Sequence, residues 1–180
     1  VQGSGPVGLS AVAMSVLGGA SLVINIGDPE ARLDLALGLG ADAVVSVSAD
    51  SAGEREALIR DLTHGRGVDV GIEASGNPAA VSEGLRLLRD GGTYVVAGHY
   101  TDTGEIPLNP HIDVNRKHAD IRGQWGTDLG HVYRALKMLA RHRERLDLSR
   151  IIGGRYDLDD AGQALADVAA LKITKAIIEP

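Results

Sequence analysis

The chain begins with Val1-Gln-Gly-Ser-Gly-Pro-Val-Gly8, a stretch in which glycines occupy positions 3, 5 and 8. In a Gly-x-Gly-x-x-Gly turn, the first glycine permits a tight bend and the second lets the backbone approach a pyrophosphate. The third glycine lets a helix pack closely against a strand. Free N–H groups at the start of that helix then face the phosphates, and the helix dipole favours their negative charge. The spacing therefore indicates a phosphate-binding turn between a strand and a helix.

Two periodicities alternate along the residues that follow the turn. Apolar residues at helical spacing predict helices over 6–17, 29–39, 52–63 and 78–88. Short runs rich in β-branched residues predict strands over 22–26, 43–47, 68–72 and 93–97, the first of them buried. This alternation is typical of βαβ units, so we expect an α/β fold with a doubly wound parallel sheet covered by helices on both faces.

The second half of the chain has a weaker pattern. Residues 98–117 lack a clear period and contain two prolines, which predicts a long loop. Two helices and two strands are expected beyond it: helices over 129–141 and 159–171, and strands over 119–123 and 173–178. The helix over 129–141 would carry Val132, Leu136 and Leu139 on its apolar face.

Asp28 lies 20 residues beyond Gly8, the spacing at which an acid usually binds ribose hydroxyls. It also precedes Pro29, which makes it a candidate N-cap for the helix over 29–39. Two other interpretations stay open at this point. The glycines could simply turn the chain, and methyltransferases that bind S-adenosylmethionine share the same layout.

Several ordered motifs resemble the coenzyme domain of zinc-type medium-chain dehydrogenases/reductases, the family of alcohol, polyol and threonine dehydrogenases. They are the segments 3–9, 37–42, 67–76 and 88–98. The tail segments 156–165 and 172–178 resemble the part of these enzymes that leaves the coenzyme domain and rejoins the catalytic domain. The resemblance covers essentially the whole chain, and it implies a Rossmann-type sheet whose first strand is largely missing here.

The resemblance also implies roles for four groups of residues. The pyrophosphate would be held by Gly3, Ser4, Gly5, Pro6, Val7 and Gly8, and the adenosine ribose would face Gly27 and Asp28. The cofactor cleft would be lined by Ala74, Ser75 and Gly76. The nicotinamide ring would lie near Ala97, Gly98 and His99.

The choice between NAD and NADP depends on the residues that follow the second strand. Members that prefer NAD commonly carry Asp where this chain has Gly27, and Asp28 stands one position later. A glycine there can make room for a 2′-phosphate, which Arg32 would reach. The negative charge of Asp28 opposes that phosphate, so we expect NAD, with NADP as the alternative.

The resemblance divides the chain into a dinucleotide-binding domain, residues 1–150, and a segment, residues 151–180, that returns to a GroES-like catalytic domain. The zinc ligands and proton-relay residues of the family precede the glycine-rich turn, so we expect no metal ligand and no catalytic residue in this chain. The implied reaction is hydride transfer between NAD(P) and an alcohol or carbonyl substrate, and we expect this fragment alone to be inactive. A zinc-free quinone or enoyl reductase of the same superfamily and a non-catalytic truncated fragment are the alternatives; a methyltransferase would have no reason to carry the tail.

The composition and charge of the chain limit the kinds of partner that we expect it to bind. The net charge of −6 disfavours nucleic acid, and no apolar run approaches the roughly 18 residues of a membrane span. The chain lacks cysteine, and its six histidines form no His-x-x-x-His pair. Arginine outnumbers lysine, which suggests a high-GC bacterial genome, and we expect a cytoplasmic location. Pairing of the edge strand over 119–123 with its copy would give a homodimer or homotetramer.

Overall fold

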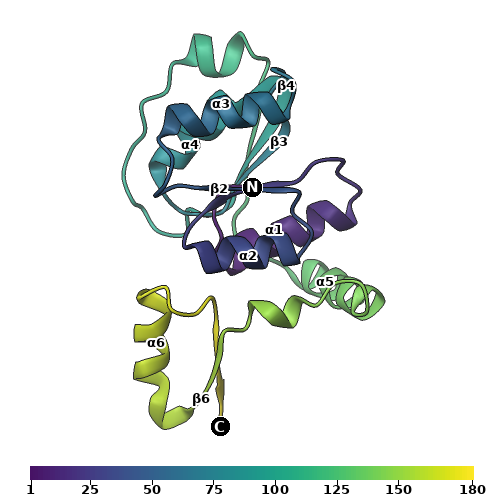
Figure 1. Ribbon diagram of the computed structural model, residues 1–180, viewed down its shortest axis with the longest axis vertical. Coiled ribbons are helices and arrows are strands. Elements are labelled where there is room, and N and C mark those ends of the chain that lie inside the picture. The colour runs from purple at the N-terminus through teal and green to yellow at the C-terminus, as the bar shows by residue number, and fades with distance from the viewer.

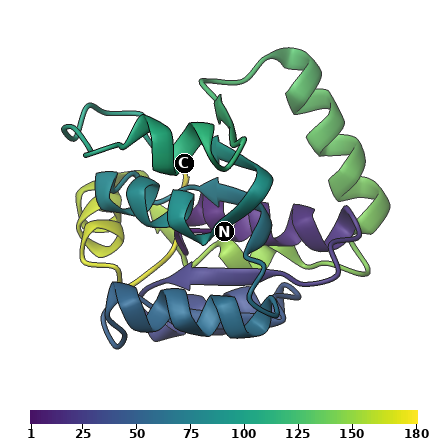
Figure 2. The ribbon, with the colours of Figure 1, turned by 90° about the horizontal axis from the view of Figure 1, so that it is seen from above.

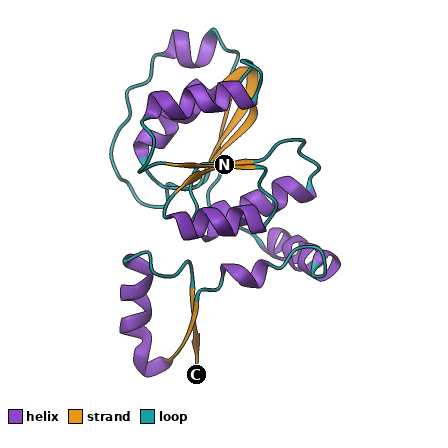
Figure 3. Ribbon diagram, viewed as in Figure 1, coloured by secondary structure: helices purple, strands orange, loops and turns teal.

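Parallel strands alternate with helices through most of the chain in the computed structural model, which describes residues 1–180 (Figure 1, Figure 3). The first five helices are α1 (Pro6–Leu17), α2 (Glu30–Gly38), α3 (Ala52–Leu62), α4 (Pro78–Leu87) and α5 (Leu129–His142). The first five strands are β1 (Ile24–Gly27), β2 (Ala43–Ser46), β3 (Val68–Glu73), β4 (Leu88–Val96) and β5 (Asp120–Gly123). The predicted elements up to residue 141 are therefore present, with ends shifted by a few residues.

The strands form a parallel sheet in two parts. β1 pairs with β2, and β4 pairs with both β3 and β5. Gln2 lies between the two parts and forms parallel bridges to Ile26 of β1 and to Glu73 of β3. The order β2-β1-Gln2-β3-β4-β5 is that of a doubly wound sheet whose first strand is reduced to Gln2 and its neighbours. The expected fold class is confirmed.

The first three residues form hydrogen bonds on both sides of this short central strand. The Val1 amine donates to the carbonyl oxygen of Ile24 at 2.8 Å, and Gly3 N donates to that of Ile26 at 2.7 Å. On the other side, Gln2 N donates to the carbonyl oxygen of Ile72 at 2.8 Å. These bonds fix the start of the glycine-rich turn at the centre of the sheet.

Helices cover both faces of the sheet, α1 and α2 on one face and α3 and α4 on the other (Figure 1, Figure 2). Under α1 and α2 the core includes Leu9, Val12, Ala36 and Leu39. On the other face, Ile24, Ile26, Val45, Ile59 and Leu87 pack together, as do Val81, Leu85, Leu88 and Tyr94. Burial of these side chains is the main favourable term that holds the helices onto the sheet.

The last part of the chain forms a small unit of its own, visible at the bottom of Figure 1. Its elements are β6 (Gly154–Asp157), a 3₁₀ turn (Leu158–Asp160), α6 (Ala161–Ala169) and β7 (Ala176–Glu179). β6 and β7 pair in parallel. β6 was not expected, the helix is shorter than the predicted 159–171, and the strand begins three residues later than the predicted 173–178.

Two further details differ from the sequence-based expectations. The predicted loop over 98–117 contains a single π-helical turn, Pro110–Asn115, whose first N–H groups donate to the side-chain oxygen of Asn109. In α5, the apolar Val132, Leu136 and Leu139 are 43%, 59% and 44% exposed, so this amphipathic helix has no covered face in the chain (Figure 2). No helix has the length and apolar character needed to cross a bilayer.

Candidate functional site

The three glycines of the turn are required for different steric reasons. A Cβ atom on Gly3, whose φ is +107°, would lie 2.8 Å from the carbonyl carbon and oxygen of Ala74. A Cβ atom on Gly8 would overlap the carbonyl oxygen of Gly3. A Cβ atom on Gly5 would meet nothing within 4 Å. Gly3 and Gly8 therefore serve the packing of the turn, whereas Gly5 borders open space that a ligand can approach.

The turn leads directly into the N-terminus of α1. Gly5 is the N-cap in extended conformation, Pro6 occupies the first helical position, and the side chain of Val7 is exposed. The first turn of α1 contains no acidic residue, so nothing there opposes an anion. The N–H groups and dipole of a 12-residue helix are thus available to a phosphate beside Gly5.

Ser4 connects the turn to the end of β1. Its buried hydroxyl donates to the carbonyl oxygen of Asp28 at 2.5 Å. A Cβ atom on Gly27 would lie 2.6 Å from Ser4 Oγ. Ser4 therefore fills the space beside Gly27.

The carboxylate of Asp28 is held at the carboxyl ends of β1 and β2. Its Oδ1 accepts hydrogen bonds from Ser46 Oγ at 2.9 Å and from Ser48 Oγ at 3.0 Å. Asp28 is not the N-cap of α2: that position belongs to Pro29, and no side chain caps the helix. The predicted capping role is wrong because the two serines take up the carboxylate instead.

Arg32 is not brought together with these residues. Its side chain is buried, and its Nη2 donates to the carbonyl oxygen of Ile173 at 2.7 Å. Its buried Nε has no hydrogen-bond partner. Burial lowers the pKa of this guanidinium below its ordinary value. Arg32 thus connects α2 to the C-terminal segment, away from Asp28 and its serine partners.

The loops that follow β3 and β4 meet at a buried carboxylate, that of Glu73. Glu73 Oε1 accepts from Ser75 N, Ser75 Oγ and Gly76 N at 2.6, 2.8 and 2.7 Å. Glu73 Oε2 accepts from Gly98 N at 3.1 Å. The side chain is fully buried. One acid at the end of β3 therefore contacts the expected cleft residues 74–76 and the expected nicotinamide-side residues 97–99.

His99 lies next to this carboxylate. Its Nε2 is 3.5 Å from Glu73 Oε2 and has no hydrogen-bond partner, although it is buried. Its Nδ1 is 3.4 Å from Thr103 Oγ1. The imidazole is thus placed at the end of β4 by Glu73 on one side and by the following loop on the other.

Steric contacts join these loops into one surface. Gly3 packs against Ala74 and Ser75, and a Cβ atom on Gly76 would lie 2.9 Å from the carbonyl oxygen of Gly98. Ser4 in turn contacts Gly27. Except for Arg32, the expected site residues therefore lie together at the carboxyl ends of β1, β3 and β4, where open α/β sheets bind their ligands.

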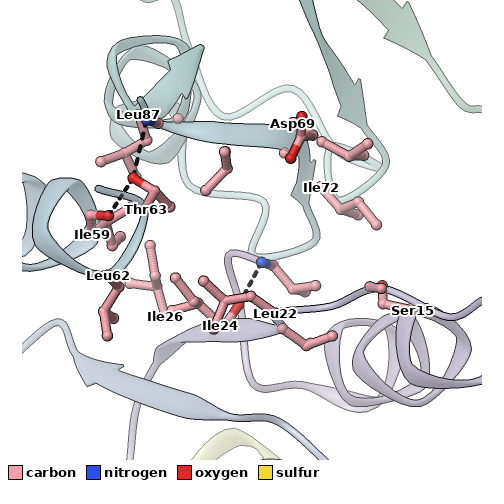
Figure 4. A pocket seen from close by; sticks show the side chains of 18 of the residues that line it. Ser15, Leu22, Ile24, Ile26, Ile59, Leu62, Thr63, Asp69, Ile72 and Leu87 are labelled. Carbon is pink, nitrogen blue, oxygen red and sulfur yellow. Dashed lines mark hydrogen bonds between the residues drawn. The ribbon is translucent and has the colours of Figure 1, made fainter. Parts of the chain in front are cut away.

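A sizeable cavity lies elsewhere in the molecule. Its volume is about 920 Å³, and it opens at the amino ends of β1 and β3, between Leu22, Ile24, Ile59, Leu62 and Ile72 (Figure 4). None of the expected site residues lines it.

The donor groups of this chain do not fit a zinc ion. No three His, Cys, Asp or Glu side chains come together in an arrangement that could hold a metal, and there is no cysteine. Structural and catalytic zinc sites use three or four such ligands. The side chains of these residues therefore provide no zinc site.

A parallel doubly wound sheet with a glycine-rich turn at its centre and an acid after β1 defines the Rossmann class of folds. The family of zinc-binding dehydrogenases matches residues 6–141, and the chain belongs to this family.

Individual relatives agree with this assignment. A 5-exo-hydroxycamphor dehydrogenase from Pseudomonas putida is 34% identical over 99% of this chain and 49% of its own length. An L-threonine 3-dehydrogenase from Chromobacterium violaceum is 31% identical over 99% of this chain and 50% of its own length. The crystal structure of an alcohol dehydrogenase from Thermotoga maritima superposes with a TM-score of 0.93, at 36% identity, over 99% of this chain and 48% of that one. The chain thus spans about half the length of the relatives it matches.

Proposed function

We propose that this chain is the nicotinamide-coenzyme-binding part of a zinc-dependent alcohol dehydrogenase. The observation that carries the proposal is the joining of three loops into one surface at the carboxyl ends of the strands: the glycine-rich turn, the end of β1 and the loops on Glu73. The matching relatives are named as dehydrogenases of a hydroxycamphor and of threonine, which supports a small alcohol or carbonyl compound as substrate.

The residues present fit a dinucleotide. Gly5 leaves room for a pyrophosphate at the N-terminus of α1, and Gly3 and Gly8 keep the turn tight. The Asp28 carboxylate, oriented by Ser46 and Ser48, would accept hydrogen bonds from ribose hydroxyls. When bound, the nicotinamide ring supplies or accepts the hydride.

We propose NAD as the preferred coenzyme. A 2′-phosphate on the ribose would meet the charge of Asp28 and the space already filled by Ser4 beside Gly27. Arg32, the cation nearest in sequence, is engaged with Ile173. The site therefore combines a repulsive carboxylate with an Arg32 side chain that is already engaged elsewhere.

We also propose that two copies of the intact protein pair through β5. All four residues of β5 are exposed, and its only strand partner is β4. An edge strand leaves N–H and C=O groups free to pair with a second chain, and a two-fold axis would pair the same edge on both copies. Light scattering on the purified protein tests this: a monomeric mass would contradict it.

The coenzyme proposal is tested by titrating the 180-residue chain with NADH and with NADPH, followed by fluorescence. Saturable binding with NADH preferred is expected, and a folded chain that binds neither would refute the proposal. Gly5→Glu should abolish binding without unfolding, because its Cβ enters open space and its carboxylate repels phosphate. Gly53→Glu is the matched control, since Gly53 also has nothing within 4 Å but lies in the first turn of α3. It should leave binding unchanged.

A further inference from the structure

We infer that Glu73 is a positioning residue that locks the loops after β3 and β4 together and so shapes the nicotinamide side of the coenzyme site. This inference rests on the proposed function. It begins from an anomaly in the core: Glu73 is the last residue of β3, and although Asp69 and Val70 of that strand are exposed, its own surface is completely inaccessible. A buried carboxylate is costly unless its oxygens are hydrogen-bonded, so the position calls for a specific reason.

The partners of the carboxylate supply that reason. Three of its four hydrogen bonds come from backbone N–H groups, those of Ser75, Gly76 and Gly98, and the fourth comes from the Ser75 hydroxyl. The first two amides belong to the loop after β3 and the third to the loop after β4. Neither loop could satisfy these inward-facing amides with strand pairing, because each has left the sheet. The acid therefore sets the distance between the two loops.

The two oxygens have separate tasks. Oε1 takes every bond from the loop after β3, and Oε2 takes the bond from Gly98 and faces His99 Nε2 at 3.5 Å. The loops also touch directly, since a Cβ atom on Gly98 would lie 2.6 Å from Gly76 N and 2.8 Å from Glu73 Oε2. The two loops are therefore held by different oxygens. If Oε2 no longer accepts a hydrogen bond, Gly98 and the neighbouring His99 are released, whereas the loop after β3 stays bound to Oε1.

This separation defines the test. In Glu73→Gln, the remaining side-chain oxygen can serve the three donors at the Oε1 position, which leaves the amide NH₂ facing Gly98 N. Two donors then oppose each other, and Gly98 loses its acceptor. We expect the Kd for NADH to rise about tenfold, the effect of one unsatisfied buried donor. The Kd for ADP-ribose, which lacks the nicotinamide, should change less than about twofold.

A purely structural role would weaken both ligands together. Glu83→Gln is the matched control: Glu83 is also buried, and it accepts from Arg55 at 2.7 and 2.9 Å without touching either loop. It should lower stability and leave the ratio of the two dissociation constants unchanged. Amide hydrogen exchange gives a second readout, in which Glu73→Gln should accelerate exchange at Gly98 while Gly76 stays protected.

The outcomes separate the two proposals. If the wild-type chain binds neither NADH nor ADP-ribose, the proposed function falls, and this inference with it. If the wild type binds both ligands and Glu73→Gln weakens both equally or neither, only the role of Glu73 is overturned. Should Glu73→Gln not fold, Glu73→Asp is read in its place. It keeps the buried charge but is one methylene too short to reach both loops, and the same selective loss of NADH is expected.

Discussion

The guanidinium of Arg32 donates a hydrogen bond at 2.7 Å to the main-chain carbonyl oxygen of Ile173, 141 residues further along the chain. The bond joins α2 on the dinucleotide-binding sheet to the segment just ahead of β7. Within that C-terminal segment the strands and helix pack mainly on one another. Arg32 is therefore an anchor for residues 151–180.

Loss of this anchor should loosen the C-terminal segment selectively. Arg32→Ala leaves the Ile173 carbonyl without its donor, and we expect a local cost of about 1–2 kcal/mol. Hydrogen–deuterium exchange should accelerate in β6 and β7 while β3 and β4 remain protected. Arg143→Ala is the control, because Arg143 is exposed and follows α5, and it should change exchange in neither region. Equal acceleration in both parts would show that Arg32 supports the whole fold instead.

Asp28 should determine the choice of coenzyme. Asp28→Ala removes the carboxylate that we propose accepts hydrogen bonds from the ribose hydroxyls, so we expect the Kd for NADH to rise at least about tenfold. Binding of NADPH should change little or improve, because a like-charged neighbour of its phosphate is gone. Parallel fluorescence titrations measure both. Asp34→Ala, an exposed acid on α2, is the control; if it alters the preference as much as Asp28→Ala does, the effect comes from general charge.

Gly8 should tolerate no side chain. In Gly8→Ala the new methyl group would overlap the carbonyl oxygen of Gly3, which is backbone and cannot move aside without distorting the turn. We expect a loss of about 1–3 kcal/mol in the free energy of unfolding, measured by urea denaturation. Gly5→Ala, with nothing within 4 Å of its Cβ, should be close to neutral. Similar losses in both variants would contradict the packing described for this turn.

In the 180-residue chain, the Val1 amine should make the free energy of unfolding depend on pH. Burial lowers the pKa of this amine from its ordinary 8.0 to about 6. Between pH 6 and 8 the unfolded chain then binds more protons than the folded chain, so stability increases as the pH rises through this window. Between pH 6 and pH 8 the free energy of unfolding should therefore rise by about 2 kcal/mol. Urea denaturation of the 180-residue chain at pH 6 and pH 8 measures it.

N-terminal acetylation is the control for that measurement. An acetylated Val1 keeps an N–H that can donate to Ile24 but has no amine to titrate. The part of the pH dependence that comes from Val1 should disappear. An unchanged pH dependence after acetylation would show that the Val1 amine is not its source.

Most of the sheet could be predicted from sequence because its strands are apolar runs between helical segments. The runs containing Ile24, Val45 and Val95 fall in strands β1, β2 and β4. β6 was missed since Tyr156 stands between Arg155 and Asp157, so the strand has no apolar run. The parallel bridges of Gln2 to β1 and β3 were not predicted, because no local pattern of apolar residues surrounds Gln2.

The candidate site was predictable only in part, for a related reason. The glycine spacing and Asp28 are local signals, and both lie where the carboxyl ends of the strands meet. The partners of Arg32 and Glu73 depend on contacts between residues distant in the chain, 141 residues for Ile173 and 25 for Gly98. An acid that ends an apolar strand and precedes Ser75-Gly76 is a signal that could have drawn attention to Glu73.

The bridges of Gln2 connect the two ladders of the sheet. The β1–β2 and β3–β4–β5 ladders share no strand pairing, and the backbone of residues 1–3 is what joins them. In this chain the two ladders are thus joined along residues 1–3, and the glycine-rich turn follows directly from these residues. A coenzyme that touches Gly5, Asp28 and Gly98 would contact the ends of both ladders and hold them together. Its binding would stabilise the folded chain, and the gain in the free energy of unfolding grows with coenzyme concentration as RT ln(1 + [L]/Kd).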